Sequence, residues 1–172
     1  MRTELPTIIL ILVATLFFIP ALVLPLVNTS GLLTGLDGSI NVMDHPDLWA
    51  QLDVVSAFFY GFGDMICHQE QSRTFMLNGN EMYICIRDFS LLTGFIIGMI
   101  LSMIREELTC IDRKRTITYL VLVLITPMEW LMEKFVDADL SVLRCITALI
   151  TGAVIGIVVV YLIRKATSVQ DE

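Results

Sequence analysis

Charged residues are scarce in this chain, and basic residues are the scarcer kind. Asp, Glu, Lys and Arg make up 17% of the 172 residues, with 11 basic against 18 acidic side chains. An average soluble domain has about 25% charged residues. Contacts with nucleic-acid phosphates need clustered Lys and Arg, so this composition argues against a nucleic-acid partner. Hydrophobic residues reach 56%, which favours a membrane protein over a soluble domain.

The chain also lacks the short motifs that accompany common enzyme chemistries. It has no glycine-rich phosphate-binding loop, no His-Glu-x-x-His pair and no Gly-x-Ser-x-Gly nucleophile turn. With two histidines, His45 and His68, a bis-histidine haem would require both to converge. A length of 172 residues is one domain's worth, which excludes separate cofactor and substrate lobes and predicts a single membrane domain over residues 1–172.

Apolar runs long enough to cross a bilayer occur four times. A helix needs about 20 mostly apolar residues to span the hydrocarbon core, and residues 7–27 supply 21 of them without a charge. Three further spans are predicted at residues 87–104, 117–136 and 140–163. The expected fold is an all-α integral membrane protein with four transmembrane helices. Gly94 and Gly98 form a small-xxx-small pattern that predicts close packing of the second span against another helix.

The distribution of Lys and Arg predicts the orientation of these spans, because cytoplasmic loops are enriched in both. Both chain ends and the segment between the second and third spans hold seven of the 11 basic residues: Arg2, Arg105, Arg113, Lys114, Arg115, Arg164 and Lys165. The outer side keeps Arg73, Arg87, Lys134 and Arg144. Both termini are therefore predicted to be cytoplasmic, in a multi-pass protein of the cell membrane that has the lipid bilayer as its partner.

The segment between the first two spans, residues 28–86, is too long for a simple connection and should have a structure of its own. Its first part, up to Asp44, is rich in Gly, Ser, Thr and Asn and predicts an irregular loop. From Pro46 to Ile66 apolar residues recur at steps of three and four, which predicts an outer amphipathic helix over residues 46–66. This helix leads directly to Cys67.

Two cysteines with polar neighbours flank a turn just ahead of the second span. Gly79 between Asn78 and Asn80 is typical of a hairpin reversal, which would bring Cys67 and Cys85 together. We select the polar residues around this turn as a candidate site: Cys67, His68, Gln69, Arg73, Cys85, Arg87 and Asp88.

This segment resembles the signature of the small prokaryotic membrane proteins grouped as domain-of-unknown-function family 2085. That signature reads Cys-His-Gln, then Arg-Ser-Phe, a glycine turn, and Cys-x-Arg-Cys or Cys-x-Arg-Asp before a membrane helix with a glycine. The matching positions are Cys67, His68, Gln69, Arg73, Phe75, Gly79, Cys85, Arg87, Asp88 and Gly94. The resemblance extends over roughly residues 50–160, through Pro127, Met128, Leu143, Arg144, Thr147 and Gly152. It implies a membrane fold and no established activity.

The chain departs from this family pattern at three places. Thr74 stands where the usual residue is Ser, and Asp88 stands where many relatives have a second Cys. Glu129 and Glu133 match an acidic or Gln pair in the third span only approximately. The departure at Asp88 bears most on function, because it decides which atom is available beside Cys85.

Four interpretations of the two cysteines stay open at this point. A Cys67–Cys85 disulfide would suit the oxidising outer compartment and would close a loop of about 18 residues, worth roughly 3 kcal/mol. A metal site would use Cys67, His68, Cys85 and Asp88, a ligand set suited to zinc. A reactive thiol would be Cys67 with His68 as base, or Cys85 beside Arg87. Two thiols without a special role are the fourth interpretation.

Three charged residues are expected within the bilayer, where charges are costly and usually paired. Glu129 and Glu133 are four apart on one face of the third span, and Arg144 lies about one turn into the fourth. A tight hairpin between these spans predicts an ion pair of Arg144 with Glu133 or Glu129, with Lys134 reaching outward. The alternative is an outward-opening polar cavity, for a proton, an ion or a lipid headgroup, that these residues share with Arg73, Arg87 and Asp88.

The sequence thus favours a multi-pass membrane protein with an outward-facing site of Cys, His, Arg and Asp side chains, stapled by a disulfide or holding a metal ion such as zinc. A membrane-embedded enzyme that uses a thiol or a metal on a lipid-linked substrate is a second hypothesis. A small ion or proton transporter, or a subunit of a homo-oligomer or larger membrane complex, is a third.

Overall fold

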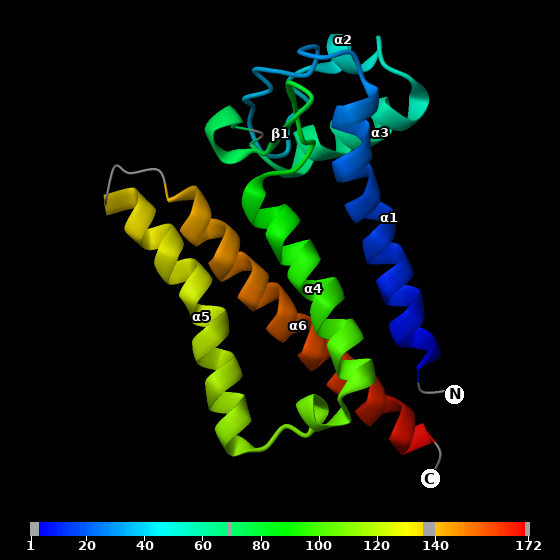
Figure 1. Ribbon diagram of the computed structural model, residues 1–172, viewed down its shortest axis with the longest axis vertical. Helices are drawn as coiled ribbons and strands as arrows, with labels where there is room; N and C mark the ends of the chain where they lie inside the picture. Colours follow the sequence, from blue (N-terminus) through cyan, green and yellow to red (C-terminus); the bar gives the residue numbers. More distant parts are fainter. Residues whose placement is uncertain (1–3, 69, 136–139, 171–172) are drawn as a thin grey trace. The chain divides into compact units, whose positions relative to one another are not determined.

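The computed structural model describes residues 4–68, 70–135 and 140–170. In chain order the elements are α1 (Leu5–Val27), α2 (Pro46–Trp49), α3 (Val54–Ile66), the 3-10 helix η1 (Gln71–Arg73), β1 (Met76–Leu77), β2 (Asn80–Glu81), α4 (Ile86–Ile104), the 3-10 helix η2 (Glu106–Thr109), α5 (Arg113–Phe135) and α6 (Ser141–Gln170) (Figure 1). The chain divides into two compact units. Unit 1 comprises Met1–Leu16 and Ser90–Glu172, and unit 2 comprises Phe17–Phe89.

Four helices in the described part of the chain are long and apolar enough to cross a membrane: Leu5–Val27, Ile86–Ile104, Arg113–Glu133 and Ser141–Ser168. They match the four spans predicted from hydropathy, which confirms the all-α membrane fold. α5 begins before its predicted start because Asp112 caps it, its Oδ1 accepting the Arg115 N–H at 2.8 Å. α6 continues past its predicted end because no Gly or Pro interrupts the sequence from Ile157 to Gln170.

In unit 1, α4 and α6 pack with their backbones in close contact. At Gly94 and Gly98 of α4 a Cβ atom would run into the backbone of α6, and at Gly152 and Gly156 of α6 it would run into the backbone of α4. Two small-xxx-small patterns therefore interlock, and only glycine permits this approach. The close packing predicted from Gly94 and Gly98 is confirmed.

α5 and α6 also pack against each other in unit 1, and Figure 1 shows them separating toward the end where α5 begins. The hydroxyls of Thr126 and Thr151 lie 2.7 Å apart across this helix pair, so each satisfies the other in apolar surroundings. The predicted turn that joins the two helices, residues 137–139, lies outside the described residues.

Unit 2 has a hydrophobic core of its own, formed by α1 from Phe17 onward, the loop that follows it, α2, α3 and the residues between the β1–β2 hairpin and α4. Its buried members are Ala21, Leu24, Leu33, Leu36, Trp49, Phe59, Tyr60, Tyr83 and Ile84. In the hairpin Met76 pairs with Glu81 and Leu77 with Asn80. Asn78 and Gly79 have φ of 54° and 72°, the left-handed conformations that such a turn requires, so the predicted reversal is confirmed.

The predicted amphipathic helix over residues 46–66 is two helices, α2 and α3, and this corrects the sequence interpretation. Asp53 is the reason, because its side chain accepts the backbone N–H groups of Val55 at 3.0 Å and Ser56 at 3.1 Å. An aspartate in this N-cap conformation starts a new helix rather than continuing the one before it. α3 alone then carries the chain to Cys67.

Two buried polar side chains of the hairpin hold the irregular loop ahead of α2. Asn80 accepts the Leu33 N–H at 3.0 Å and donates to the Pro25 carbonyl at 2.9 Å. Glu81 accepts the Gly35 N–H at 2.6 Å. A loop without regular structure must still satisfy its backbone groups, and here the hairpin provides those partners.

Candidate metal centre

Cys67 is the first residue after α3 and is held by that helix end. Its N–H donates to the Gly63 carbonyl at 2.9 Å, while its own backbone is extended, with φ −132° and ψ 148°. The side chain is 7% exposed. The helix therefore fixes the position of Cys67, and the change to extended backbone turns the following residues away from the helix axis.

Cys85 and Asp88 are placed by the start of α4. Cys85 precedes the first helical residue, and its carbonyl accepts the Phe89 N–H at 3.0 Å. Asp88 follows three residues later in the first turn, so both side chains lie on one side of the helix end. The Cys85 thiol donates to the Asp88 Oδ2 at 3.1 Å.

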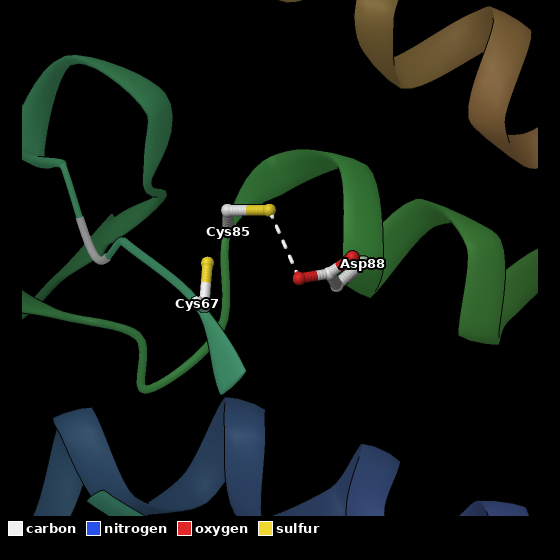
Figure 2. A group of neighbouring side chains, drawn as sticks. All are labelled: Cys67, Cys85 and Asp88. Carbon is white, nitrogen blue, oxygen red and sulfur yellow. Dashed lines mark hydrogen bonds between the residues drawn. The ribbon is translucent and has the colours of Figure 1, made fainter. Parts of the chain in front are cut away.

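The hairpin brings these two segments together, and Figure 2 shows the resulting group. The sulfur atoms of Cys67 and Cys85 and a carboxylate oxygen of Asp88 all lie within 4.8 Å of one another. Cys67 comes from the end of α3, and the other two come from the start of α4. Both cysteines lie in the described part of the chain, and no disulfide joins them in this structure.

The surroundings of Cys85 favour the protonated form of its thiol. Its hydrogen bond with Cys67, its burial and the nearby charge of Asp88 all raise the pKa of the Cys85 thiol. A thiol must lose its proton to act as a nucleophile or as a metal ligand. A cation bound between the three groups would act in the opposite direction and favour the thiolate.

His68, predicted as a fourth ligand, lies apart from the thiol–carboxylate group. Its Nδ1 is 3.1 Å from the Gly38 carbonyl oxygen, and its backbone carbonyl accepts the Gly38 N–H at 2.9 Å. Successive side chains of an extended segment point to opposite sides, so Cys67 and His68 cannot easily serve one centre. His68 instead lines an open polar pocket of about 420 Å³ with Asp37, Gly38, Glu70 and Arg73.

The other predicted site residues are spread over different surroundings. Arg73 forms an exposed ion pair with Glu70 at 3.1 Å and faces the same polar pocket as His68. Arg87 is partly buried in the first turn of α4. Gln69 lies outside the described residues. Of the seven predicted residues, the structure brings Cys67, Cys85 and Asp88 into one group of donor atoms.

The charges expected within the bilayer are buried in α5 and α6. Arg144 donates from Nε to the Glu133 Oε1 at 2.8 Å and also from Nη2 to the same oxygen. Their side chains are 5% and 8% exposed, so the predicted Glu133–Arg144 ion pair is confirmed. Glu129 is buried one turn away and lines a mostly apolar pocket of about 330 Å³. The cavity predicted to be shared with Arg73, Arg87 and Asp88 stays a prediction.

Two buried carboxylates in unit 2 were not selected from the sequence. Asp64 accepts the Trp49 indole N–H at 2.8 Å and the His45 N–H at 3.1 Å. Glu81 holds the loop at Gly35 and is fully buried. The sequence spacing could have indicated the burial of Asp64. It follows Tyr60 by one helical turn, so both residues lie on the same, buried face of α3.

Four apolar spans, a glycine-packed helix pair and a folded segment between the first two spans define a small multi-pass helical membrane protein. A family model described as "Predicted membrane protein (DUF2085)" matches residues 67–162, more than half of the chain. The chain belongs to this family, which confirms the resemblance seen in the sequence.

The uncharacterized protein MJ1492 of Methanocaldococcus jannaschii is 38% identical over 47 residues, which are 27% of this chain and 30% of that protein. The match therefore spans less than a third of the relative's length. No solved structure matches the chain.

Proposed function

We propose that this membrane protein binds a divalent metal ion of the zinc class through Cys67, Cys85 and Asp88. The observation that carries the proposal is the convergence of three donor atoms within 4.8 Å of one another. Zinc–ligand bonds of about 2.0–2.3 Å in a tetrahedron place neighbouring ligand atoms roughly 3.5–3.8 Å apart. The 4.8 Å limit on the observed separations exceeds that spacing by only about 1 Å.

The chemistry of these donors favours zinc over the hard cations. Two thiolates and a carboxylate form a mixed soft and hard set, whereas Ca²⁺ and Mg²⁺ prefer oxygen ligands throughout. Three protein ligands leave the fourth position of a tetrahedral ion open for water or a substrate, as in catalytic zinc sites. Such an ion would act as a Lewis acid. This chemistry is compatible with the hypothesis of a metal-assisted enzyme, which the sequence also suggested.

Two competing interpretations use the same sulfur atoms in other ways. A Cys67–Cys85 disulfide would account for the proximity of the thiols but would leave the Asp88 carboxylate without a role in the group. A nucleophilic Cys67 would need His68 as its base, whereas His68 faces the Gly38 carbonyl. The metal site is the interpretation that uses all three side chains.

The proposed site faces outward, with both termini in the cytoplasm. The support is the positive-inside distribution of Lys and Arg, because seven of the 11 basic residues belong to the chain ends and the segment between the second and third spans. An impermeant maleimide tests this, because Cys110 is exposed and lies on the predicted cytoplasmic side. A Ser72→Cys variant should react in intact cells, while Cys110 should react only after permeabilisation. The reverse pattern would invert the topology.

Metal analysis of the detergent-purified protein tests the site itself. We expect one zinc per chain in the wild type and a loss of at least tenfold in metal affinity for Cys67→Ser and Cys85→Ser. Cys110→Ser and Cys145→Ser are matched controls and should keep the metal. His68→Ala should also keep it, because the His68 ring faces the Gly38 carbonyl.

Thiol counting separates the metal site from a disulfide. Metal-free protein that gains two reactive thiols on reduction would show a disulfide and would overturn the proposal. A wild type without metal and with all thiols already reactive would overturn it as well.

A further inference from the structure

A mostly apolar groove of about 430 Å³ lies between α5 and α6 in unit 1, toward the end of the pair where α5 begins. On α5 it is lined by Thr116, Leu120 and Val123, and on α6 by Val154, Val158 and Tyr161. Its volume lies within the roughly 300–1,000 Å³ of small-ligand sites. The lining suits a hydrocarbon chain and offers an inorganic ion almost no ligands.

Each wall of the groove continues into a basic residue. On α5, Arg113 comes three residues before Thr116, seven before Leu120 and ten before Val123, the spacing of one helix face. On α6, Lys165 follows Tyr161 by four residues, and its Nζ lies 6.0 Å from the centre of the Tyr161 ring. Each of these cations therefore lies about one helical turn beyond a lining residue of the groove, on its own helix.

Two neighbouring basic residues at this end, Arg115 and Arg164, are held within the fold. Arg115 donates to the Cys110 carbonyl at 2.7 Å, and Arg164 pairs with Glu4 at 2.9 Å. Arg113 and Lys165 are exposed, and neither forms an ion pair with any residue in the part of the chain that the structure describes. Their charges are available to a ligand.

We propose that this groove binds an anionic phospholipid, with an acyl chain between α5 and α6 and the phosphate between Arg113 and Lys165. The charge at the mouth selects an anionic headgroup, and the apolar walls select a lipid over free phosphate. The tyrosine in the wall suits the headgroup level, where such amphipathic rings concentrate. The inference is independent of the metal site and of which leaflet this end faces.

Native mass spectrometry of the detergent-purified protein tests the inference. Dioleoyl phosphatidylglycerol and dioleoyl phosphatidylcholine, which have the same acyl chains, are the probes. We expect preferential retention of phosphatidylglycerol by the wild type. Each basic residue near an anionic headgroup contributes roughly a fivefold preference, so the double variant Arg113→Gln/Lys165→Gln should lose about 25-fold.

Lys114→Gln is the matched control. It removes the same charge at the same helix end but is rotated away from the groove face, so the preference should survive. An equal loss in this control would show unspecific attraction to the basic end and would overturn the proposal. An unchanged double variant would overturn it too.

A groove variant tests the part played by the acyl chain. Leu120→Trp fills space between the helices from an exposed position, and it should weaken retention of both lipids while leaving the protein folded. Retention that is unchanged in this variant, or displacement of phosphatidylglycerol by millimolar inorganic phosphate alone, would reject the groove as the binding site.

Discussion

The Cys85 thiol donates a hydrogen bond to the Asp88 carboxylate across 3.1 Å, within the turn that begins α4. The three-residue spacing of a helix start fixes this pair, whereas the approach of Cys67 depends on the hairpin. A local pair and a distant third donor therefore meet in one group. The charge of Asp88 can be removed by an amide side chain of nearly the same size.

Asp88→Asn tests the charge of the proposed ligand set. The amide keeps the size of the side chain but binds zinc far more weakly than a carboxylate does, so we expect at least a tenfold loss in zinc affinity. Asp88→Cys should restore tight binding, because a third thiolate replaces the oxygen ligand. Competition for zinc with a chromophoric chelator measures the zinc affinity of both variants. Asp47→Asn, on the exposed surface of α2, is the control and should leave this affinity unchanged.

Glu81 should make the stability of the protein depend on pH. Burial raises the pKa of the Glu81 carboxyl, against the opposing effect of the N–H groups of Gly35 and Leu36. Because the folded state holds this proton more tightly, the contribution is most favourable below the unfolded pKa. It is lost as the pH rises through the folded pKa.

The comparison of Glu81→Gln with the wild type isolates this effect. The difference in melting temperature should shift in favour of the variant as the pH rises from about 4.5 upward, since glutamine needs no proton to stay neutral. Glu70→Gln changes an exposed carboxylate of the same unit and should show no such shift. Parallel curves for wild type and Glu81→Gln would contradict the prediction.

The spans were predictable because membrane insertion is decided by local composition. Twenty apolar residues suffice to identify a spanning helix, whatever it packs against, and the four spans were found in this way. The Glu133–Arg144 pair followed from the same reasoning, since charges within such spans need partners. The gap between α2 and α3 did not follow, because the apolar period continues through Asp53 and only its capping bonds reveal the break.

The candidate site was only partly predictable for a different reason. The hairpin signal at Asn78–Gly79 correctly brought Cys67 and Cys85 together. Sequence adjacency suggested that His68 joins them, but the extended backbone after α3 turns its ring toward Gly38. Glu81 was missed because nothing in its local pattern indicates complete burial. That burial arises from the loop that folds over the hairpin.

Even alanine at position 152, in place of Gly152, should destabilise the protein. A Cβ atom there would meet the backbone of Leu91 on α4, and a helix backbone cannot move aside as a flexible side chain can. Gly152→Ala should therefore lower the free energy of unfolding by about 1–3 kcal/mol or more, as overpacking does. Thermal unfolding in detergent measures this loss.

Gly61→Ala is the matched control for that variant. The added Cβ would make ordinary contacts of 3.7 Å with Met43 and 3.8 Å with Trp49. Alanine also favours a helix over glycine by about 1 kcal/mol. This variant should be neutral or stabilising, and a loss equal to that of Gly152→Ala would show that the two effects do not come from close helix packing.

Removing one charge of the Glu133–Arg144 ion pair should destabilise the protein more than removing both charges together. Arg144→Gln leaves the Glu133 carboxylate buried without its guanidinium, and breaking a buried pair in this way costs about 3–5 kcal/mol. The double variant Glu133→Gln/Arg144→Gln removes both charges together and keeps a polar pair able to form a hydrogen bond. Because desolvation of the charges is avoided, we expect it to recover most of the folded yield in detergent. A double variant as unstable as the single one would show that the ion pair is not the interaction that Arg144 contributes.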